Sequence, residues 1–371
     1  MDTIVWLIIF LVTCGITVGC LVLLKHFESA WLRRMIFAVV VALFFIPTIV
    51  LGLKRPLNAP IIFLHLTGYL LGALIVDGIL CLVARKREKK ADEPRGRRLA
   101  RVATASLFGC LIYLSMGFLC ANWVRRTEYV FETEKAIENG CLRIAQISDV
   151  HLGTTNDCGD FEKLLRCVSE KNADILVITG DFVDEYTSRE DMLRACKAFS
   201  TECKIDRVFF IAGNHEELDG VDFTAEELFT ELRANRVAVL RDETLLVNDS
   251  FYVVGRKDAS ESRKTMTELL KGVDMSKYII VLDHQPNDFA REAAAGADLT
   301  LAGHTHGGYL FPLRFLSSYL NVLFSEAECI SGSGTKLNMN YVVSAGVGTW
   351  GCSFKTGTRS EYVIIDIKSL K

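Results

Sequence analysis

The stretch Leu142-Arg-Ile-Ala-Gln-Ile-Ser-Asp-Val-His151 opens the C-terminal part of the chain and sets its pattern. A short apolar run that stops at polar residues is typical of a buried strand. Similar runs follow at Ile175–Thr179, Val208–Ala212, Phe251–Val254, Tyr278–Leu282, Leu299–Ala302, Tyr341–Ser344 and Tyr362–Ile367. Helix-like stretches lie between them, at Phe161–Glu170, Arg189–Phe199, Ala225–Asn235, Ser262–Leu270 and Asp288–Ala294. This alternation predicts an α/β layered domain, and the composition of Ser331–Thr335 predicts a flexible loop.

Polar side chains follow five of these strands at the point where each strand ends. The five loops begin at Ser148, Gly180, Gly213, Asp283 and Gly303. In an open α/β sheet, ligands bind at the carboxyl ends of the strands. The C-terminal part has five histidines, and all of them lie in these loops: His151, His215, His284, His304 and His306. A lone histidine is more often a core or surface residue, but five at strand ends indicate one common site.

The residue types in these loops suit a pair of divalent metal ions. Imidazole, carboxylate and amide groups are present and thiolate is absent, which favours Mn²⁺, with Fe or Zn²⁺ as alternatives, over a cysteine-built zinc site. In Asp149-x-His151 both side chains lie on one side of an extended strand, and His304-x-His306 shares that geometry. The glycines of the loops either leave room for a phosphate near the backbone or serve as plain turn formers.

Together the loops resemble the motif set of the calcineurin-like metallophosphoesterases, in the expected order and over residues 142–371. The motifs are Asp149-x-His151, Gly180-Asp181-x-x-Asp184, Gly213-Asn214-His215-Glu216, His284 and Gly303-His304-x-His306. The resemblance implies a layered β-sandwich flanked by helices. The Asp-His-Gln-Pro and Gly-His-Thr-His-Gly-Gly versions resemble the bacterial membrane-anchored branch, which includes enzymes similar to UDP-2,3-diacylglucosamine hydrolases. This chain has Tyr309 where that branch usually has Gln.

Carried over residue by residue, the resemblance implies a dinuclear metal site. One metal would be held by Asp149, His151 and His306, the other by Asn214, His284 and His304, and Asp181 would bridge both. Two metals that share a carboxylate acidify a bridging water, and the resulting hydroxide attacks phosphorus. His215 would protonate or stabilise the leaving oxygen, and Asp184 would orient His215. Glu216 is either a solvated or capping residue or a partner of the metal ligands.

Weaker signals point to substrate contacts. Gly346 and Gly348 lie in a glycine-rich stretch that resembles the family's last active-site loop, and Arg359 is a candidate anion contact. Tyr309 is a further candidate contact, and it opens an apolar stretch that runs to Phe324. That stretch is either ordinary core or a hydrophobic lip over a lipid-like substrate.

The N-terminal part predicts four transmembrane helices, at residues 3–24, 35–53, 61–84 and 102–124. Each run is long enough to cross a bilayer, and buried helices of a soluble core would show a polar face on at least some of the four. The third run contains Asp77, an intramembrane carboxylate that is by default a functional signal, although simple pairing or snorkelling is the favoured interpretation. We therefore expect a membrane segment over residues 1–126 and a metallophosphoesterase domain over residues 127–371, with a short linkage from Arg125 to the first strand at Leu142.

The distribution of basic residues predicts that this domain lies outside the cytoplasm. The loops after the first and third spans carry twelve Lys and Arg, against four on the other side, and the richer side is usually cytoplasmic. Cysteine is the counter-evidence, because the domain has seven, an odd number without a Cys-x-x-Cys pair, and free thiols suit the cytosol. The expected location is the cell membrane, as a multi-pass protein.

Charge argues against nucleic acid as a partner. Residues 1–126 carry a net charge of +10 and residues 127–371 a net charge of −13, whereas nucleic-acid binding needs a basic surface. The sequence thus predicts a membrane-anchored, dinuclear metal-dependent phosphoesterase that hydrolyses a phosphoester or pyrophosphate bond of a phosphorylated, lipid-like substrate. A cytosolic domain would favour a UDP-diacylglucosamine-type pyrophosphate hydrolase. The third alternative is a non-catalytic membrane sensor with a metal-binding domain.

Overall fold

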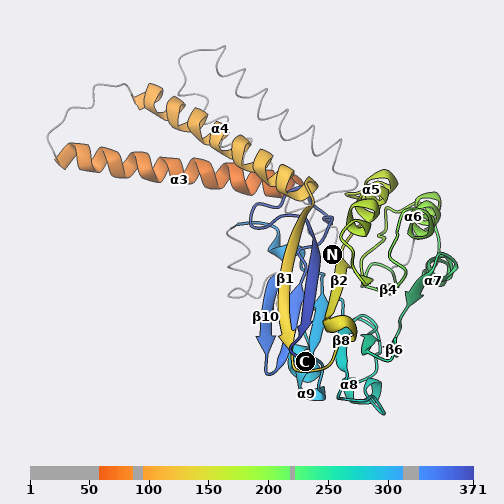
Figure 1. The fold of residues 1–371 in the computed structure, drawn as a ribbon. Coiled ribbons are helices and arrows are strands. Elements are labelled where there is room, and N and C mark those ends of the chain that lie inside the picture. Colours follow the sequence, from red (N-terminus) through yellow and green to blue (C-terminus); the bar gives the residue numbers. More distant parts are fainter. Residues whose placement is uncertain (1–57, 87–94, 218–221, 312–325) are drawn as a thin grey trace. The chain divides into compact units, whose positions relative to one another are not determined.

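The computed structural model describes residues 58–86, 95–217, 222–311 and 326–371. The chain divides into two compact units, Met1–Met116 and Gly117–Lys371. Helices α3 (Asn58–Lys86) and α4 (Arg95–Asn122) are the long elements of the N-terminal part (Figure 1). Their apolar spans, Leu64–Val83 and Ala100–Asn122, are long enough to cross a membrane.

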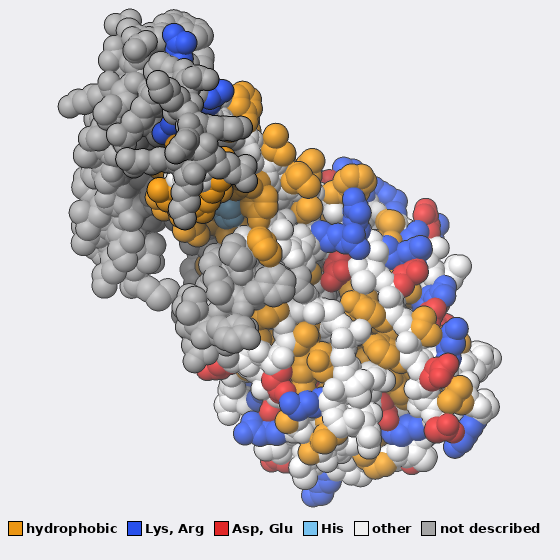
Figure 2. Space-filling view, turned by 90° about the vertical axis from the view of Figure 1, so that its left-hand side faces the viewer, with side chains coloured by type: hydrophobic (Ala, Val, Ile, Leu, Met, Phe, Trp, Pro, Cys, Tyr) orange, Lys and Arg blue, Asp and Glu red, His pale blue; other side chains and the backbone are white. Residues whose placement is uncertain are grey.

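These two helices correspond to the third and fourth predicted spans, whereas the predicted spans at residues 3–24 and 35–53 lie outside the described residues. The structure therefore describes two long apolar helices where the sequence predicted four. Many of their apolar side chains are exposed, for example Ile75 at 63% and Ile112 at 61%. On the face shown in Figure 2, apolar side chains gather on the described helix residues, while charged side chains are scattered over the domain.

Polar side chains of α3 find partners on α4. The Arg98 Nε lies 3.0 Å from a carboxylate oxygen of Asp77, and the Ser106 hydroxyl donates to the backbone oxygen of Tyr69 at 3.4 Å. The favoured interpretation of Asp77 as a paired residue is confirmed. Pairing lowers the cost of placing a carboxylate inside a bilayer.

The second unit is a sandwich of two mixed six-stranded sheets (Figure 1). The first sheet has the strand order β1 (Arg125–Thr133), β12 (Glu361–Ser369), β2 (Cys141–Ile147), β3 (Ile175–Thr179), β4 (Val208–Ile211) and β5 (Val237–Val239). The second has the order β10 (Gly332–Lys336), β11 (Met339–Val343), β9 (Leu299–Ala302), β8 (Tyr278–Leu282), β7 (Phe251–Gly255) and β6 (Glu243–Val247). Four neighbouring strands in each sheet are parallel, β2 to β5 in the first and β7, β8, β9 and β11 in the second.

Helices cover the outer face of each sheet, which gives the domain four layers. Helices α5 (Cys158–Ser169), α6 (Arg189–Thr201) and α7 (Ala225–Ala234) pack on the first sheet around a cluster of buried phenylalanines. Helices α8 (Met266–Leu269) and α9 (Phe289–Ala295) pack on the second sheet. A third apolar cluster, which includes Ile144 and Ile280, fills the space between the sheets. The β-sandwich flanked by helices is thus confirmed.

The expected linkage between the last membrane span and the first strand is wrong. Residues 125–133 form strand β1, which starts three residues after α4 ends and pairs in parallel with β12. Tyr129 and Phe131 pack against the cluster between the sheets, whereas Val130 is exposed. The apolar residues are only three, Tyr129 to Phe131, and burial alternates along the strand, so this edge strand lacks the long apolar run that marks the inner strands.

The expected flexible loop at Ser331–Thr335 is also wrong. Residues 332–336 form strand β10, which pairs antiparallel with β11 at the edge of the second sheet. Backbone hydrogen bonds hold this strand, and the Tyr341 side chain lies across Gly334, where a Cβ would meet its hydroxyl end. An edge strand of this kind needs no apolar side chains, so its composition resembles that of a loop.

Candidate metal centre

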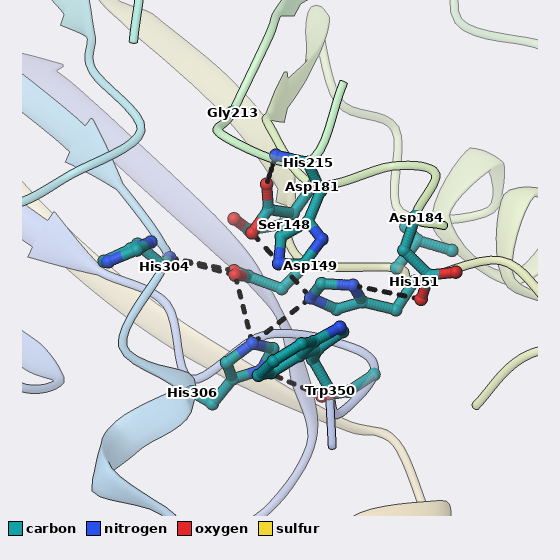
Figure 3. Close-up of polar contacts among 12 residues, drawn as sticks. Ser148, Asp149, His151, Asp181, Asp184, Gly213, His215, His304, His306 and Trp350 are labelled. Atoms are coloured by element: carbon teal, nitrogen blue, oxygen red, sulfur yellow. Dashed lines mark hydrogen bonds and ion pairs between the residues drawn. The ribbon is translucent and has the colours of Figure 1, made fainter. Parts of the chain in front are cut away.

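The five polar loops follow β2, β3, β4, β8 and β9, and the sandwich brings their side chains together (Figure 3). Three groups of potential ligand atoms each lie within 4.8 Å of one another. The first group is Asp149, His151 and His306, and the second is Asp181, His284 and His304. The third group joins them, because it contains His151, Asp181 and His215. Asp181 therefore lies between the two predicted metal-binding triads.

The distances within the triads fit coordination by cations. The Nε2 atoms of His151 and His306 face each other at 3.2 Å, and His304 Nδ1 lies 3.3 Å from His284 Nε2. The amide oxygen of Asn214 is buried without a hydrogen-bond partner. Unpaired buried oxygen and facing imidazole nitrogens are costly unless a cation satisfies them. The nitrogen and oxygen donors suit a divalent ion such as Mn²⁺, Fe²⁺ or Zn²⁺.

Electrostatics keep three of the predicted ligands, His304, His306 and Asp181, in the forms that bind metal. In contrast, burial raises the pKa of Asp149, and at His284 burial is outweighed by the charge of Asp181, which raises the pKa. Burial and the neighbouring His284 lower the pKa of His304 to about 4, and burial with His151 lowers the pKa of His306 well below its usual range. Both imidazoles are therefore neutral, which is the ligating form. Burial alone would raise the pKa of Asp181, but His284 and the other nearby histidines outweigh it and hold that pKa well below the ordinary value.

The ligand side chains sit on strained backbone. Positive φ angles occur at Asp149 (53°), His151 (47°) and Asp181 (53°). They recur at His304 (71°) and His306 (48°). Non-glycine residues adopt this left-handed conformation uncommonly, and such strain gathers where function requires a particular side-chain direction. The loops thus aim successive ligands inward at the expense of backbone energy.

Two glycines of the ligand loops are required because other groups come close to their backbone, and not only because the chain turns there. At Gly180, which has a φ of 89°, a Cβ would lie 2.5 Å from His284 Nδ1. At Gly303 a Cβ would overlap Ser148 Oγ and lie 2.5 Å from the Asp149 carboxylate. Both positions therefore need glycine because ligand side chains occupy the space, whatever turn the backbone makes.

Glu216 is a partner of the ligand loops. Its side chain is buried and accepts hydrogen bonds from four backbone N–H groups, those of Asp181, Phe182, Val183 and Gly213. Its two oxygens thereby tie the loop after β3 to the loop after β4. The solvated alternative for Glu216 is wrong, because burial and backbone donors, invisible in the motif itself, decide its role.

The predicted pairing of Asp184 with His215 differs from the structure. Asp184 Oδ2 lies 3.4 Å from Nδ1 of His151, so it supports a predicted metal ligand. His215 Nδ1 instead lies 3.3 Å from the carboxylate of Glu185. The chain turns at Glu185 and Tyr186, where the Thr187 N–H donates to the backbone oxygen of Asp184, and the neighbouring side chains of Asp184 and Glu185 reach different histidines. Sequence reasoning missed Glu185, and its place directly after the Gly-Asp-x-x-Asp motif was the only signal for it.

The four candidate substrate contacts lie in different environments. Gly346 and Gly348 pack against the loop after β2, and the Gly348 N–H donates to the backbone oxygen of Asp149 at 2.7 Å. The Tyr309 ring lies 4.8 Å from the ring of His306. Arg359 is exposed. Substrate contact stays a prediction for all four.

Two further residues line the site without having been predicted from the sequence. Lys355 is fully buried, and its ammonium donates to the backbone oxygens of Ala345 and Gly346, behind the loop that carries Asp149. Trp350 donates its indole N–H to Glu185 at 2.9 Å. Both come from the segment before β12, far in the sequence from the metal-ligand motifs of β2 and β3.

The chain is similar in sequence to a known protein family and to several of its members. A family model for calcineurin-like phosphoesterases matches residues 142–308. An uncharacterized metallophosphoesterase of Aquifex aeolicus (strain VF5) is 33% identical over 270 residues, which are 71% of this chain and 97% of that relative. An uncharacterized metallophosphoesterase of Campylobacter jejuni is 29% identical over 240 residues, 62% of this chain and 60% of the relative. A transmembrane protein with metallophosphoesterase domain from Danio rerio is 29% identical over 244 residues, 61% of this chain and 53% of the relative.

Proposed function

This chain belongs to the calcineurin-like metallophosphoesterase family, and from that premise we propose that it hydrolyses a phosphoester or pyrophosphate bond of a lipid-like substrate at a membrane surface. It is a metal-dependent phosphoesterase with a candidate dimetal site. The observation that supports the reaction type best is the position of Asp181, whose carboxylate lies near His284 and His304 and also near His151 of the first triad. A carboxylate shared in this way holds two cations close together.

The chain's own residues divide the work of the site. Asp149, His151 and His306 would hold one divalent ion, Asn214, His284 and His304 the other, and Asp181 both; Mn²⁺ is the proposed metal, with Fe or Zn²⁺ as alternatives. When bound, the two ions supply an acidified water as nucleophile and neutralise charge on the phosphoryl oxygens.

His215 is the proposed proton donor to the leaving oxygen. With Nδ1 facing Glu185 at 3.3 Å, its Nε2 is the atom that can pass a proton to substrate. Burial lowers the pKa of His215, but the hydrogen bond to Glu185 and the charge of Asp181 outweigh it and raise the pKa to about 9. His215 therefore carries a proton at neutral pH.

The link between α4 and the site supports a substrate at the membrane surface. Within the second unit, the backbone oxygens of Gly117 and Cys120 accept from the N–H groups of Lys355 and Ser360, both at 2.9 Å. Thr356, which follows Lys355, donates its N–H to the backbone oxygen of Tyr309 at 2.9 Å, and the Tyr309 ring packs against the His306 ring. The last turns of a membrane-length helix are thus joined to the predicted metal ligand His306 through three residues, Lys355, Thr356 and Tyr309.

Apolar side chains around this link suit a lipid. Trp123, just after α4, is 64% exposed, and the Arg125 guanidinium lies 4.8 Å from its ring, a combination that favours a membrane–water boundary. Phe311 is 51% exposed, and its N–H donates to Thr356. The rest of the predicted hydrophobic lip, residues 312–325, lies outside the described residues.

Orientation decides which lipid is available. We propose an extracytoplasmic domain from the bias of Lys and Arg, which favours lipid phosphates or lipid pyrophosphates as substrates. A cytosolic domain would instead favour a UDP-diacylated sugar as substrate, as the resemblance to the UDP-2,3-diacylglucosamine hydrolase-like branch implies. The names of the three relatives give no substrate.

The function is tested by metal-dependent turnover of the detergent-solubilised chain, first with an aryl phosphate and then with lipid phosphates. Asp181→Asn should abolish turnover and reduce bound metal, because it removes negative charge from both ions. Asp206→Asn, an exposed carboxylate away from the site, is the matched control and should behave as wild type. Bound metal without turnover of any phosphoester would favour the sensor alternative.

The substrate class is tested by comparing kcat/KM for a short-chain and a long-chain phosphoester in bilayers. We expect preference for the long chain and a loss of that preference, but not of aryl phosphate turnover, in Phe311→Ser. Equal kcat/KM for both chain lengths in wild type and variant would leave a phosphatase without lipid specificity.

A further inference from the structure

The pairing of His215 with Glu185 continues to a third residue. One carboxylate oxygen of Glu185 accepts from the Trp350 indole N–H at 2.9 Å, and the other lies 3.3 Å from His215 Nδ1. The rings of His215 and Trp350 are 5.2 Å apart. Each side chain thus contacts the other two, and Figure 3 shows Trp350 among the side chains of the site.

Trp350 is itself held in place by the site. Its backbone N–H donates to the Tyr309 hydroxyl at 3.2 Å, and that hydroxyl donates to its backbone oxygen at 3.1 Å. The Tyr309 ring packs on His306. The indole therefore approaches Glu185 from a fixed backbone position, anchored on a predicted metal ligand.

Resting on the proposed function, we propose that Trp350 is a positioning residue, which fixes the Glu185 carboxylate and through it the ring of His215. A glutamate side chain has three rotatable bonds, and holding one of its oxygens leaves the other aimed at a single point. Without the indole N–H, the Glu185 carboxylate is free to turn toward water and His215 loses its fixed direction. Asp184 cannot replace Glu185, because its oxygens face His151 and the Tyr186 N–H.

Trp350 could instead contact the substrate or pack against the ligand loops, and these two roles depend on other parts of its side chain than the positioning role does. A platform for the substrate's leaving group would use the face of the ring, which Trp350→Phe largely preserves. A packing residue for the ligand loops would change metal binding when altered. A positioning role uses the N–H, and it requires Glu185 to be present.

The experiment is a double-mutant cycle on the intact chain in detergent, with an aryl phosphate as substrate and bound metal measured on each variant. Trp350→Phe should lower kcat about 10-fold with KM within twofold, the scale of losing one hydrogen bond to a charged group. In a Glu185→Ala background, which is itself impaired, the same exchange should have no further effect. Glu185→Gln should retain more activity than Glu185→Ala, because its amide oxygen can still accept a hydrogen bond from one of the two neighbouring N–H groups. Asp206→Asn, an exposed residue away from the site, is the control and should be unchanged.

Three results would overturn the inference. A raised KM with unchanged kcat in Trp350→Phe would make Trp350 a substrate contact. An equal fall of kcat with and without Glu185 would show that Trp350 does not act through Glu185, and a loss of bound metal would make it a packing residue. Absence of metal-dependent turnover in the wild type would instead overturn the proposed function, and this inference with it.

Discussion

At the scale of single residues, the metal centre depends on space that only glycine leaves open. We expect Gly303→Ala to lose bound metal and turnover, because the new methyl group would overlap Ser148 Oγ and lie 2.5 Å from the Asp149 carboxylate. Ser148→Ala removes the nearest obstacle, so adding it should restore part of the metal, measured by metal analysis of the purified protein. No recovery at all in the double variant would contradict this steric account.

Substitution of Asp184 should weaken metal binding, whereas substitution of His215 should lower the catalytic rate. Asp184 lies 3.4 Å from a predicted ligand, His151, so Asp184→Asn should weaken metal affinity by about 10- to 100-fold. His215→Ala should keep its metal and lower kcat by about 10²–10⁴, the usual range for a lost proton-transfer group. Metal titrations and saturating-metal kinetics on both variants separate the two effects. Loss of metal in His215→Ala would make His215 a ligand.

At the scale of secondary-structure elements, an ion pair joins two strands of the first sheet. Arg143 on β2 and Asp366 on β12 are direct partners in the antiparallel register, with a shortest N–O distance of 2.7 Å. The hydrogen bond from Arg143 holds the pKa of Asp366 below its ordinary value. A carboxyl group with a lowered folded pKa stabilises the protein above its unfolded pKa, and that stability disappears as the pH falls through the folded pKa.

Asp366→Asn should therefore lower the thermal midpoint at pH 7 by about 1–3 °C, since a cross-strand ion pair contributes about 0.2–1 kcal/mol and the pair is partly exposed. The difference from wild type should shrink below about pH 4 and vanish in stronger acid. Thermal melts across this range, with Asp206→Asn as control, measure it. A difference that stays constant with pH would point to lost packing in place of lost charge.

At the scale of the whole molecule, the catalytic domain starts directly at the end of a membrane-length helix. Hydrogen bonds from Ser360 to Cys120 and Ala121 hold the last turn of α4 to the domain. The side of the membrane on which α4 ends therefore decides which compartment supplies the substrate.

The thiol of a native cysteine can be used to determine on which side of the membrane the domain lies. Among the cysteines that the structure describes, Cys141 is the exposed one. In cells with an intact membrane, a membrane-impermeant maleimide should label the wild-type chain, and Cys141→Ser should lose this label. Labelling only after permeabilisation would place the domain in the cytoplasm and favour the UDP-diacylated substrate.

The sequence by itself determined the order of the inner strands along the chain, the two described membrane-length helices and the residue types of the metal centre. These features are local, because a buried strand or span needs an apolar run and a ligand needs a particular side chain at the strand end. The seven predicted ligands could be named for the same reason. The structure gathers six of them into two triads and leaves the oxygen of the seventh, Asn214, buried without a hydrogen-bond partner.

Only the tertiary structure decided which carboxylate serves which histidine and what completes the site. Asp184 and Glu185 are neighbours in the sequence but face His151 and His215, and Trp350 joins them from beyond β11. Edge strands β1 and β10 likewise depend on their partners β12 and β11. Pairings of this kind are set by how distant segments pack, and a side chain's direction in a loop follows from the backbone that the whole fold imposes on it.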